Sequence, residues 1–261
     1  MDQAIKSVRR EEMKQLGKVL LKAGTMLMSA GANTGRIRNT INRIASAFDY
    51  SVELHISQRA LSLTIMDEEE SSFVSKLRRT PPHVINFTIL SGISKMSWNI
   101  VQDNWSSEQI LADLERLEKM PHYHRWMVLS LVGLAGAGFC ALANGSPMDL
   151  LFTFLASFLG LFVRQEAVKA NFNPYLAIYF AALTASLIAG GAVKLGLGHA
   201  DSYAFVTSVL FLIPGVPLIN SFSDIIDGNI QNGITRGVNA LVISFSIALG
   251  IFTSTFIYQF Q

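Results

Sequence analysis

The chain has 261 residues, of which 50% are hydrophobic and 15% are charged, and its formal net charge is +2. The single cysteine, Cys140, lies in an apolar stretch and excludes an intramolecular disulfide, so nothing points to an oxidising compartment. No P-loop or other ATP-binding motif is present, and we expect neither a cofactor, nor a metal, nor a nucleic-acid partner.

The first part of the chain, residues 1–120, is charged and mixed and carries helical apolar spacing at both of its ends. Apolar residues at positions 13, 16, 20, 23 and 27 predict a first helix. Asn33 or Thr34 can cap a second helix, and Ser106 with Gln109 fits the capping box of the last helix in this part.

The second predicted helix carries three arginines, Arg36, Arg38 and Arg43, which give it a basic face. Such a face is usually a solvated surface. The alternative is contact with anionic lipid head groups or with an anionic solute. The sequence leaves both interpretations open.

Between these helices the apolar period changes from helical spacing to alternation. Val52–Ile56 and Leu61–Ile65 alternate apolar and polar residues, as half-buried strands do. The acidic run Asp67–Glu70 indicates a turn before a third strand at Phe73–Leu77. The predicted order is ααβββαα, an α+β domain that we expect to be cytoplasmic, because basic residues crowd its N-terminus and no signal peptide precedes it.

The second part, residues 121–261, is almost continuously apolar, and only four of the chain's 21 Lys and Arg residues lie beyond residue 125. It has room for a bundle of five transmembrane helices. The positive-inside rule keeps the N-terminal domain on the cytoplasmic side and leaves Gln261 outside. The expected spans are residues 126–143, 148–163, 174–193, 203–219 and 238–258.

The fourth span is interrupted near its end by Pro214, Gly215 and Pro217. Proline removes a backbone donor and clashes with the preceding turn. In lipid, the carbonyls that are left without partners must be satisfied within the protein or line a wet cavity. Transporters place substrate sites at such broken helices, so we predict one here.

Polar residues follow this break. If the chain stays helical, Asn220, Asp224 and Asp227 share one face, with Ser223 beside them and Arg236 further on. The carboxylates could bind a proton, Na⁺ or an ammonium group, and the guanidinium could bind a carboxylate. The alternative is that the span ends at the proline and an ordinary cytoplasmic loop follows. Apolar residues interleaved with the polar ones favour the first interpretation.

A second candidate group, Arg164 and Glu166, ends the second span. We count both among the predicted substrate-binding residues. The simpler interpretation is that Arg164 extends to the lipid head groups and that Glu166 pairs with Lys169.

Three stretches resemble the threonine/serine exporter family. They are Ser29–Ile37, the strand pair from Val52 to Ile65, and Pro214–Pro217 followed by Asp224, Gly228, Gly233 and Arg236. The likeness is strongest to the large subunit of two-component bacterial exporters, including those for succinate. It implies export of a small amino acid or dicarboxylate across the bacterial inner membrane, together with a smaller five-span membrane partner of the same family. Because no ATP-binding motif is present, we expect the export to be secondary and proton-coupled.

Two other functions compete with this hypothesis. A membrane-anchored enzyme could use Ser29, Asp49 and His55 of a hydrolase-like head, although nothing in their spacing demands a triad. A membrane scaffold or regulatory protein could bind a partner, or a second copy of itself, through small-residue helix faces.

Overall fold

A computed structural model describes residues 2–67, 73–81, 84–121, 123–197 and 204–258, with side chains from Val8 onward. Its contacts group the chain into two compact units. Unit 1 comprises Met1–Pro121 and Val216–Gly237, and unit 2 comprises His122–Gly215 and Val238–Gln261. Sequence analysis assigned all of residues 121–261 to the membrane domain, whereas the segment Val216–Gly237 packs with the N-terminal residues.

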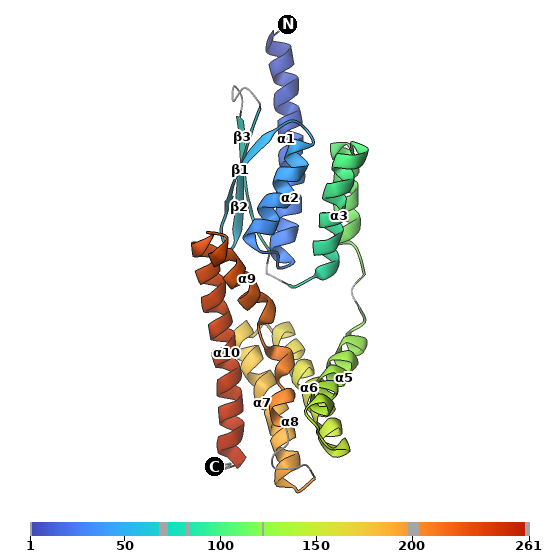
Figure 1. Cartoon of the computed structure of the whole chain (residues 1–261), viewed down its shortest axis with the longest axis vertical. Coiled ribbons are helices and arrows are strands. Elements are labelled where there is room, and N and C mark those ends of the chain that lie inside the picture. Colours follow the sequence, from blue (N-terminus) through green and yellow to red (C-terminus); the bar gives the residue numbers. More distant parts are fainter. Residues whose placement is uncertain (1, 68–72, 82–83, 122, 198–203, 259–261) are drawn as a thin grey trace. The chain divides into compact units, whose positions relative to one another are not determined.

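Unit 1 has a small sheet, two central helices and an outer helix pair. Figure 1 shows the sheet beside α1 and α2, with α3 on their other side. Apolar residues of all these layers form one core. The helices are α1 (Asp2–Ser29), α2 (Thr34–Ser46), α3 (Phe87–Asp103), α4 (Ser107–Glu118), α9 (Gly215–Ile226) and the first residues of α10 (Ile230–Tyr258).

The sheet is antiparallel in the order β1-β2-β3, formed by Ser51–Ile56, Ala60–Met66 and Phe73–Arg79. The predicted alternation is confirmed in β2, whose residues Leu61, Leu63 and Ile65 are fully buried. The third strand is confirmed as well. Most of the acidic run that we interpreted as a turn, residues 68–70, lies outside the described residues.

The predicted helix starts are also confirmed. The side chain of Asn33 caps α2 by accepting a hydrogen bond from the backbone N–H of Arg36 at 2.8 Å. Ser106 and Gln109 form the expected capping box of α4. Gly31 has a φ of +92°, which favours glycine, at the turn that ends α1.

Unit 2 consists of apolar helices. They are α5 (Arg125–Leu142), α6 (Pro147–Lys169), α7 (Pro174–Lys194), α8 (Ala204–Thr207), the 3₁₀ helix η1 (Leu210–Leu212) and the remainder of α10. Among the residues that the structure describes, four helices are long and apolar enough to cross a membrane, namely α5, α6, α7 and α10. A fifth span is present if Ala204–Leu212 and Gly215–Ile226 form one interrupted span.

The predicted break in the helix is confirmed, since the chain bends by 61° between Ala204–Leu212 and Gly215–Ile226. The alternative of an ordinary loop is wrong for Gly215–Ile226, which is helical. Pro217 is the third residue of α9. A proline is tolerated there because the N–H groups of the first turn have no partner within the helix.

Two helix limits also differ from the predicted spans. Helix α6 continues beyond residue 163 to Lys169, and α10 begins at Ile230 rather than at residue 238. Arg164, Glu166 and Arg236 therefore lie on helices. The predicted limits differ because hydropathy marks only where the apolar residues end. A helix continues into polar residues as long as its backbone hydrogen bonds continue.

Candidate functional site

A buried carboxylate, that of Asp224 on α9, is the centre of the polar contacts in unit 1. Its side chain has no exposed surface. Oδ1 accepts a hydrogen bond from the backbone N–H of Thr34 at 2.8 Å, and Oδ2 accepts one from the Thr34 hydroxyl at 3.1 Å. The Nε atom of Arg236 lies 3.1 Å from Oδ2. The carboxylate is thus compensated by one guanidinium and two neutral donors.

The local sequence explains why Thr34 meets this carboxylate. Thr34 is the first residue of α2, so its N–H has no acceptor within the helix. The N-terminus of a helix also carries partial positive charge, which stabilises an anion. Burial of a carboxylate is costly unless it is paired and hydrogen-bonded, and both conditions are met here.

The predicted polar face of α9 is confirmed as a face. Asn220 donates from Nδ2 to the carbonyl of Gly31 at 2.7 Å, one turn before Asp224. One turn after it, Asp227 lies beside Gly35, where an added Cβ would be 3.1 Å from Asp227 Oδ2. All three side chains are directed at the loop and first turn between α1 and α2.

Two asparagines that the sequence analysis did not single out join the same network. Asn232 of α10 donates from Nδ2 to the carbonyl of Ile56 at 2.9 Å and to the Thr34 hydroxyl at 3.3 Å. Asn229 accepts a hydrogen bond from Arg38 at 3.3 Å. With Arg236, these two asparagines are spaced i, i+3 and i+7, a polar face that periodicity alone could have revealed.

Close packing of α9 on α10 fixes the distance between Asp224 and Arg236. The Ser221 hydroxyl donates to the carbonyl of Gly233 at 2.7 Å. A Cβ at Gly233 would lie only 2.8 Å from the backbone oxygen of Ser221, so glycine is needed for this approach. Gly228, with a φ of +81°, makes the turn between the two helices.

The remaining predicted residues after the break do not join this network. Pro214 precedes α9, Gly215 begins it and Pro217 lies in its first turn. Ser223 is half-buried on α9. The three residues at the break shape the backbone, whereas the polar contacts come from Asn220 and Asp224.

Arg164 and Glu166 belong to α6 in unit 2. Glu166 pairs with Lys169 at 3.2 Å, as the simpler interpretation predicted, and it also pairs with Arg125 of α5. The Nε atom of Arg125 donates to Gln165 at 2.7 Å. This ion-pair cluster joins α5 to α6, and Arg125 is the member that sequence analysis missed.

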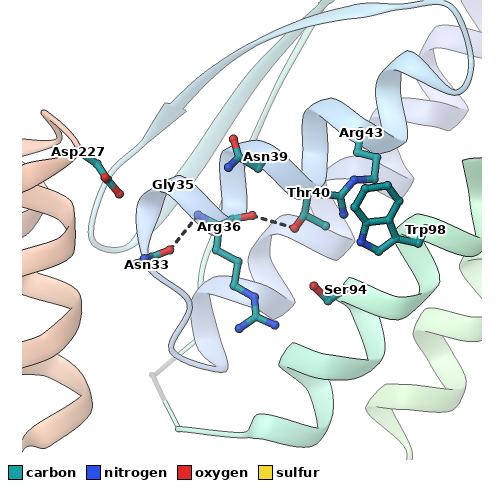
Figure 2. Close-up of a pocket in the computed structure, with 9 residues that line it drawn as sticks. All are labelled: Asn33, Gly35, Arg36, Asn39, Thr40, Arg43, Ser94, Trp98 and Asp227. Carbon is teal, nitrogen blue, oxygen red and sulfur yellow. Dashed lines mark hydrogen bonds between the residues drawn. The ribbon is translucent and has the colours of Figure 1, made fainter.

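A cavity of about 340 Å³ opens between α2 and α3 of unit 1 (Figure 2). Asp227 is the predicted site residue that lines it. Two of the three arginines on the basic face of α2 line it too, and Arg38 does not. The lining residues are Asn33, Gly35, Arg36, Asn39, Thr40, Arg43, Ser94, Trp98 and Asp227.

Both cavity arginines are held by neighbours. The guanidinium of Arg43 stacks 3.7 Å from the centre of the Trp98 ring and donates to the Ser97 hydroxyl at 2.9 Å. Arg36 donates to the carbonyl of Leu90 at 3.1 Å. Across the described ranges, no group of three or more His, Cys, Asp or Glu residues could hold a metal ion.

Comparison with known proteins identifies relatives along most of the chain. Residues 18–258 match the family model described as "Putative threonine/serine exporter". The "Probable succinate transporter subunit YjjP" of Escherichia coli is 26% identical over 249 residues, which cover 94% of this chain and 95% of that protein. No solved structure matches the chain.

Two further relatives are longer proteins. The "Threonine/serine exporter" of Corynebacterium glutamicum is 22% identical over 238 residues, which cover 88% of this chain and 48% of that protein. The "Probable threonine/serine exporter" of Mycobacterium tuberculosis is 22% identical over 240 residues, which cover 90% of this chain and 44% of that protein.

Proposed function

Since this chain belongs to the threonine/serine exporter family of multi-pass bacterial membrane transporters, we propose that it is one subunit of a secondary exporter for a small amino acid or a dicarboxylate. The relatives that it matches are named for threonine, serine or succinate, all small molecules that carry a carboxylate. The observation that carries the proposal is the buried Asp224–Arg236 pair, whose aspartate lies on the helix that follows the break in the interrupted span. Intramembrane and near-membrane ion pairs of this kind mark transport pathways.

A smaller membrane partner of the same family completes the exporter in this proposal. The relative that is matched over almost its full length is named a subunit. This chain matches less than half of the length of each longer exporter. In this proposal a second chain corresponds to the part of those exporters that this chain does not match. Two such parts form an inverted repeat in many secondary transporters.

Proton coupling is the next step of the proposal. Protonation of Asp224 would remove the negative charge that binds Arg236 and the Thr34 N–H. The Arg236 guanidinium would then be available to a substrate carboxylate, and Asp227 would offer a second carboxylate to a proton or a substrate amine. Arg236 would thus pair alternately with Asp224 and with the substrate carboxylate. Because the first pairing requires deprotonated Asp224, this alternation would link proton movement to substrate movement.

We place the N-terminal residues 1–120 in the cytoplasm and the apolar helices in the inner membrane, following the distribution of Lys and Arg. The single cysteine makes this testable in intact cells with a membrane-impermeant maleimide. In a Cys140→Ser background, Arg59→Cys should stay unlabelled until the cells are opened, and Leu197→Cys should label at once. The opposite pattern would reverse the orientation.

The enzyme alternative has weaker support. The Ser29 hydroxyl donates to the carbonyl of Met26 at 3.0 Å. No hydrogen bond joins Ser29, Asp49 and His55 within the part of the chain that the structure describes. Hydrolysis by the full chain that is lost in Ser29→Ala would nevertheless establish it.

The decisive experiment is counterflow in proteoliposomes. The chain would be purified with the proposed smaller membrane partner of the same family, and threonine, serine and succinate would be offered in turn. Uptake of one labelled substrate against its unlabelled pool, absent for either chain alone, supports the proposal. Uptake that is unchanged when an imposed proton gradient is collapsed would remove proton coupling, and the absence of counterflow for all three would remove the substrate class.

A further inference from the structure

The cavity between α2 and α3 contains two arginines, Arg36 and Arg43, that have no acidic partner among the described residues, and the proposed transport mechanism uses neither of them. We propose that this cavity binds a small dicarboxylate anion. The inference goes beyond the exporter proposal, because it concerns a ligand site in unit 1 and is tested by binding rather than by transport.

The spacing of the two guanidiniums favours a ligand with two anionic groups. Arg36 and Arg43 are seven residues apart, which is two turns of α2, or about 10.5 Å along its axis. Residues at this spacing share a helix face, and both side chains line the same cavity (Figure 2). Each guanidinium can bind one carboxylate through parallel hydrogen bonds.

Both arginines are already positioned. Stacking on Trp98 and the bond to Ser97 hold Arg43, while the bond to the Leu90 carbonyl uses one nitrogen of Arg36. Side chains that are ordered before binding lose less conformational entropy when the ligand arrives. The arrangement is therefore a preformed site.

The charge balance of the cavity favours an anion over a zwitterion. Within the residues that the structure describes, neither Arg36 nor Arg43 makes an ion pair with a carboxylate. The only acidic residue in the lining is Asp227, which lies beside Gly35 at the start of α2. Two positive charges against one negative charge leave the cavity with a net positive charge, which attracts an anion, while the presence of two guanidiniums favours a ligand with two carboxylates.

The remaining lining and the size fit a metabolite rather than a polymer. Asn39, Thr40 and Ser94 add amide and hydroxyl groups that can bond carboxylate oxygens. A volume of about 340 Å³ lies near the lower end of the range for small-molecule sites. Asn33 and Gly35 flank Thr34, so the ligand would bind next to the residue that holds Asp224.

The test is calorimetric titration of the full-length chain in lipid nanodiscs with succinate. We expect saturable binding and a change in tryptophan fluorescence that is absent in Trp98→Phe. Arg36→Gln and Arg43→Gln should each weaken binding about 10- to 100-fold, the effect of losing a hydrogen-bonded charge. Arg59→Gln removes the same charge from an exposed turn and should leave the affinity unchanged.

A second measurement needs no variant and so does not depend on how each substitution folds. Succinate should slow the modification of Arg36 and Arg43 by phenylglyoxal, followed by peptide mass spectrometry, and should leave Arg59 reacting at its original rate. Protection of both cavity arginines supports the site. Equal reaction rates with and without succinate would overturn it.

Inorganic phosphate and threonine test two other assignments of the cavity. If inorganic phosphate competes as strongly as succinate, the cavity is a phosphate site and the dicarboxylate assignment fails. If threonine binds and succinate does not, Asp227 recognises an ammonium group and the charge argument is wrong. Transport can succeed or fail independently of either result, so the two proposals can be separated.

Discussion

Replacing Asp224 with asparagine tests whether the buried ion pair supports the packing of α9 and α10 in unit 1. Asparagine keeps an oxygen that can accept the Thr34 N–H, but it removes the negative charge. Arg236, whose side chain is only 20% exposed, would then be left without its partner. The structure therefore predicts a loss of stability before any effect on transport is considered.

The size of this loss follows from burial. Removing one partner of a buried pair lowers the free energy of unfolding by about 3–5 kcal/mol. Because Arg236 is partly exposed, we expect Asp224→Asn to cost about 3 kcal/mol, the lower end of this range. For a chain of this size that is a fall in Tm of about 6–12 °C. Arg236→Gln should cost about 4 kcal/mol, because the carboxylate left behind is fully buried.

The double variant separates pairing from simple damage. Asp224→Asn with Arg236→Gln leaves no unpaired charge, so the double variant should be no less stable than the worse single variant. The coupling between the two substitutions should then be at least about 3 kcal/mol. Tm in nanodiscs, followed by tryptophan fluorescence, measures all three. The exposed Glu11–Lys14 pair provides a control, since Glu11→Gln should leave Tm almost unchanged. Additive losses within about 0.5 kcal/mol would refute the pairing argument.

Two further substitutions test the contacts around this pair. Thr34→Val removes the hydroxyl bond to Asp224 and keeps the backbone bond, so we expect a loss of about 1–2 kcal/mol that Thr34→Ser largely restores, measured by the same thermal unfolding. Gly233→Ala forces a Cβ to within 2.8 Å of the α9 backbone and should cost about 1–3 kcal/mol. Gly138→Ala, where nothing lies within 4 Å, should be neutral or slightly stabilising, and equal losses at both glycines would contradict the packing argument.

Much of unit 1 could be predicted because local chemistry decides it. The alternation in β2 places Leu61, Leu63 and Ile65 on one face whatever packs against them. Asn33 and Ser106 begin their helices by accepting a hydrogen bond from the N–H group three residues ahead, within the reach of a short sequence window. The apolar spans were recognisable for the same reason.

The partners of Asp224 could not be predicted in the same way. Thr34 lies 190 residues earlier in the chain, and no local pattern joins the two. Sequence analysis interpreted Asp224 as a carboxylate that could bind a proton, Na⁺ or an ammonium group. In the structure it is fully buried against Thr34 and Arg236. Long-range contacts of this kind depend on how the folded elements pack, which periodicity does not encode.

Asp227 is the better residue for probing transport, because its removal should not disturb the fold. It is exposed, and it makes no ion pair among the residues that the structure describes. We expect Asp227→Asn to keep Tm within about 1–2 °C of the parent, since exposed substitutions usually change stability by less than 0.5 kcal/mol. The same change removes the one negative charge of the cavity, so succinate should bind more tightly.

Counterflow and succinate binding of Asp227→Asn test the transport proposal and the cavity inference separately. Lower counterflow with unchanged Tm and tighter succinate binding would assign Asp227 to proton or substrate handling. Unchanged counterflow would remove Asp227 from the transport proposal and leave the cavity inference intact. Weaker succinate binding would count against the charge argument for the cavity, because loss of a nearby negative charge can only favour an anion electrostatically.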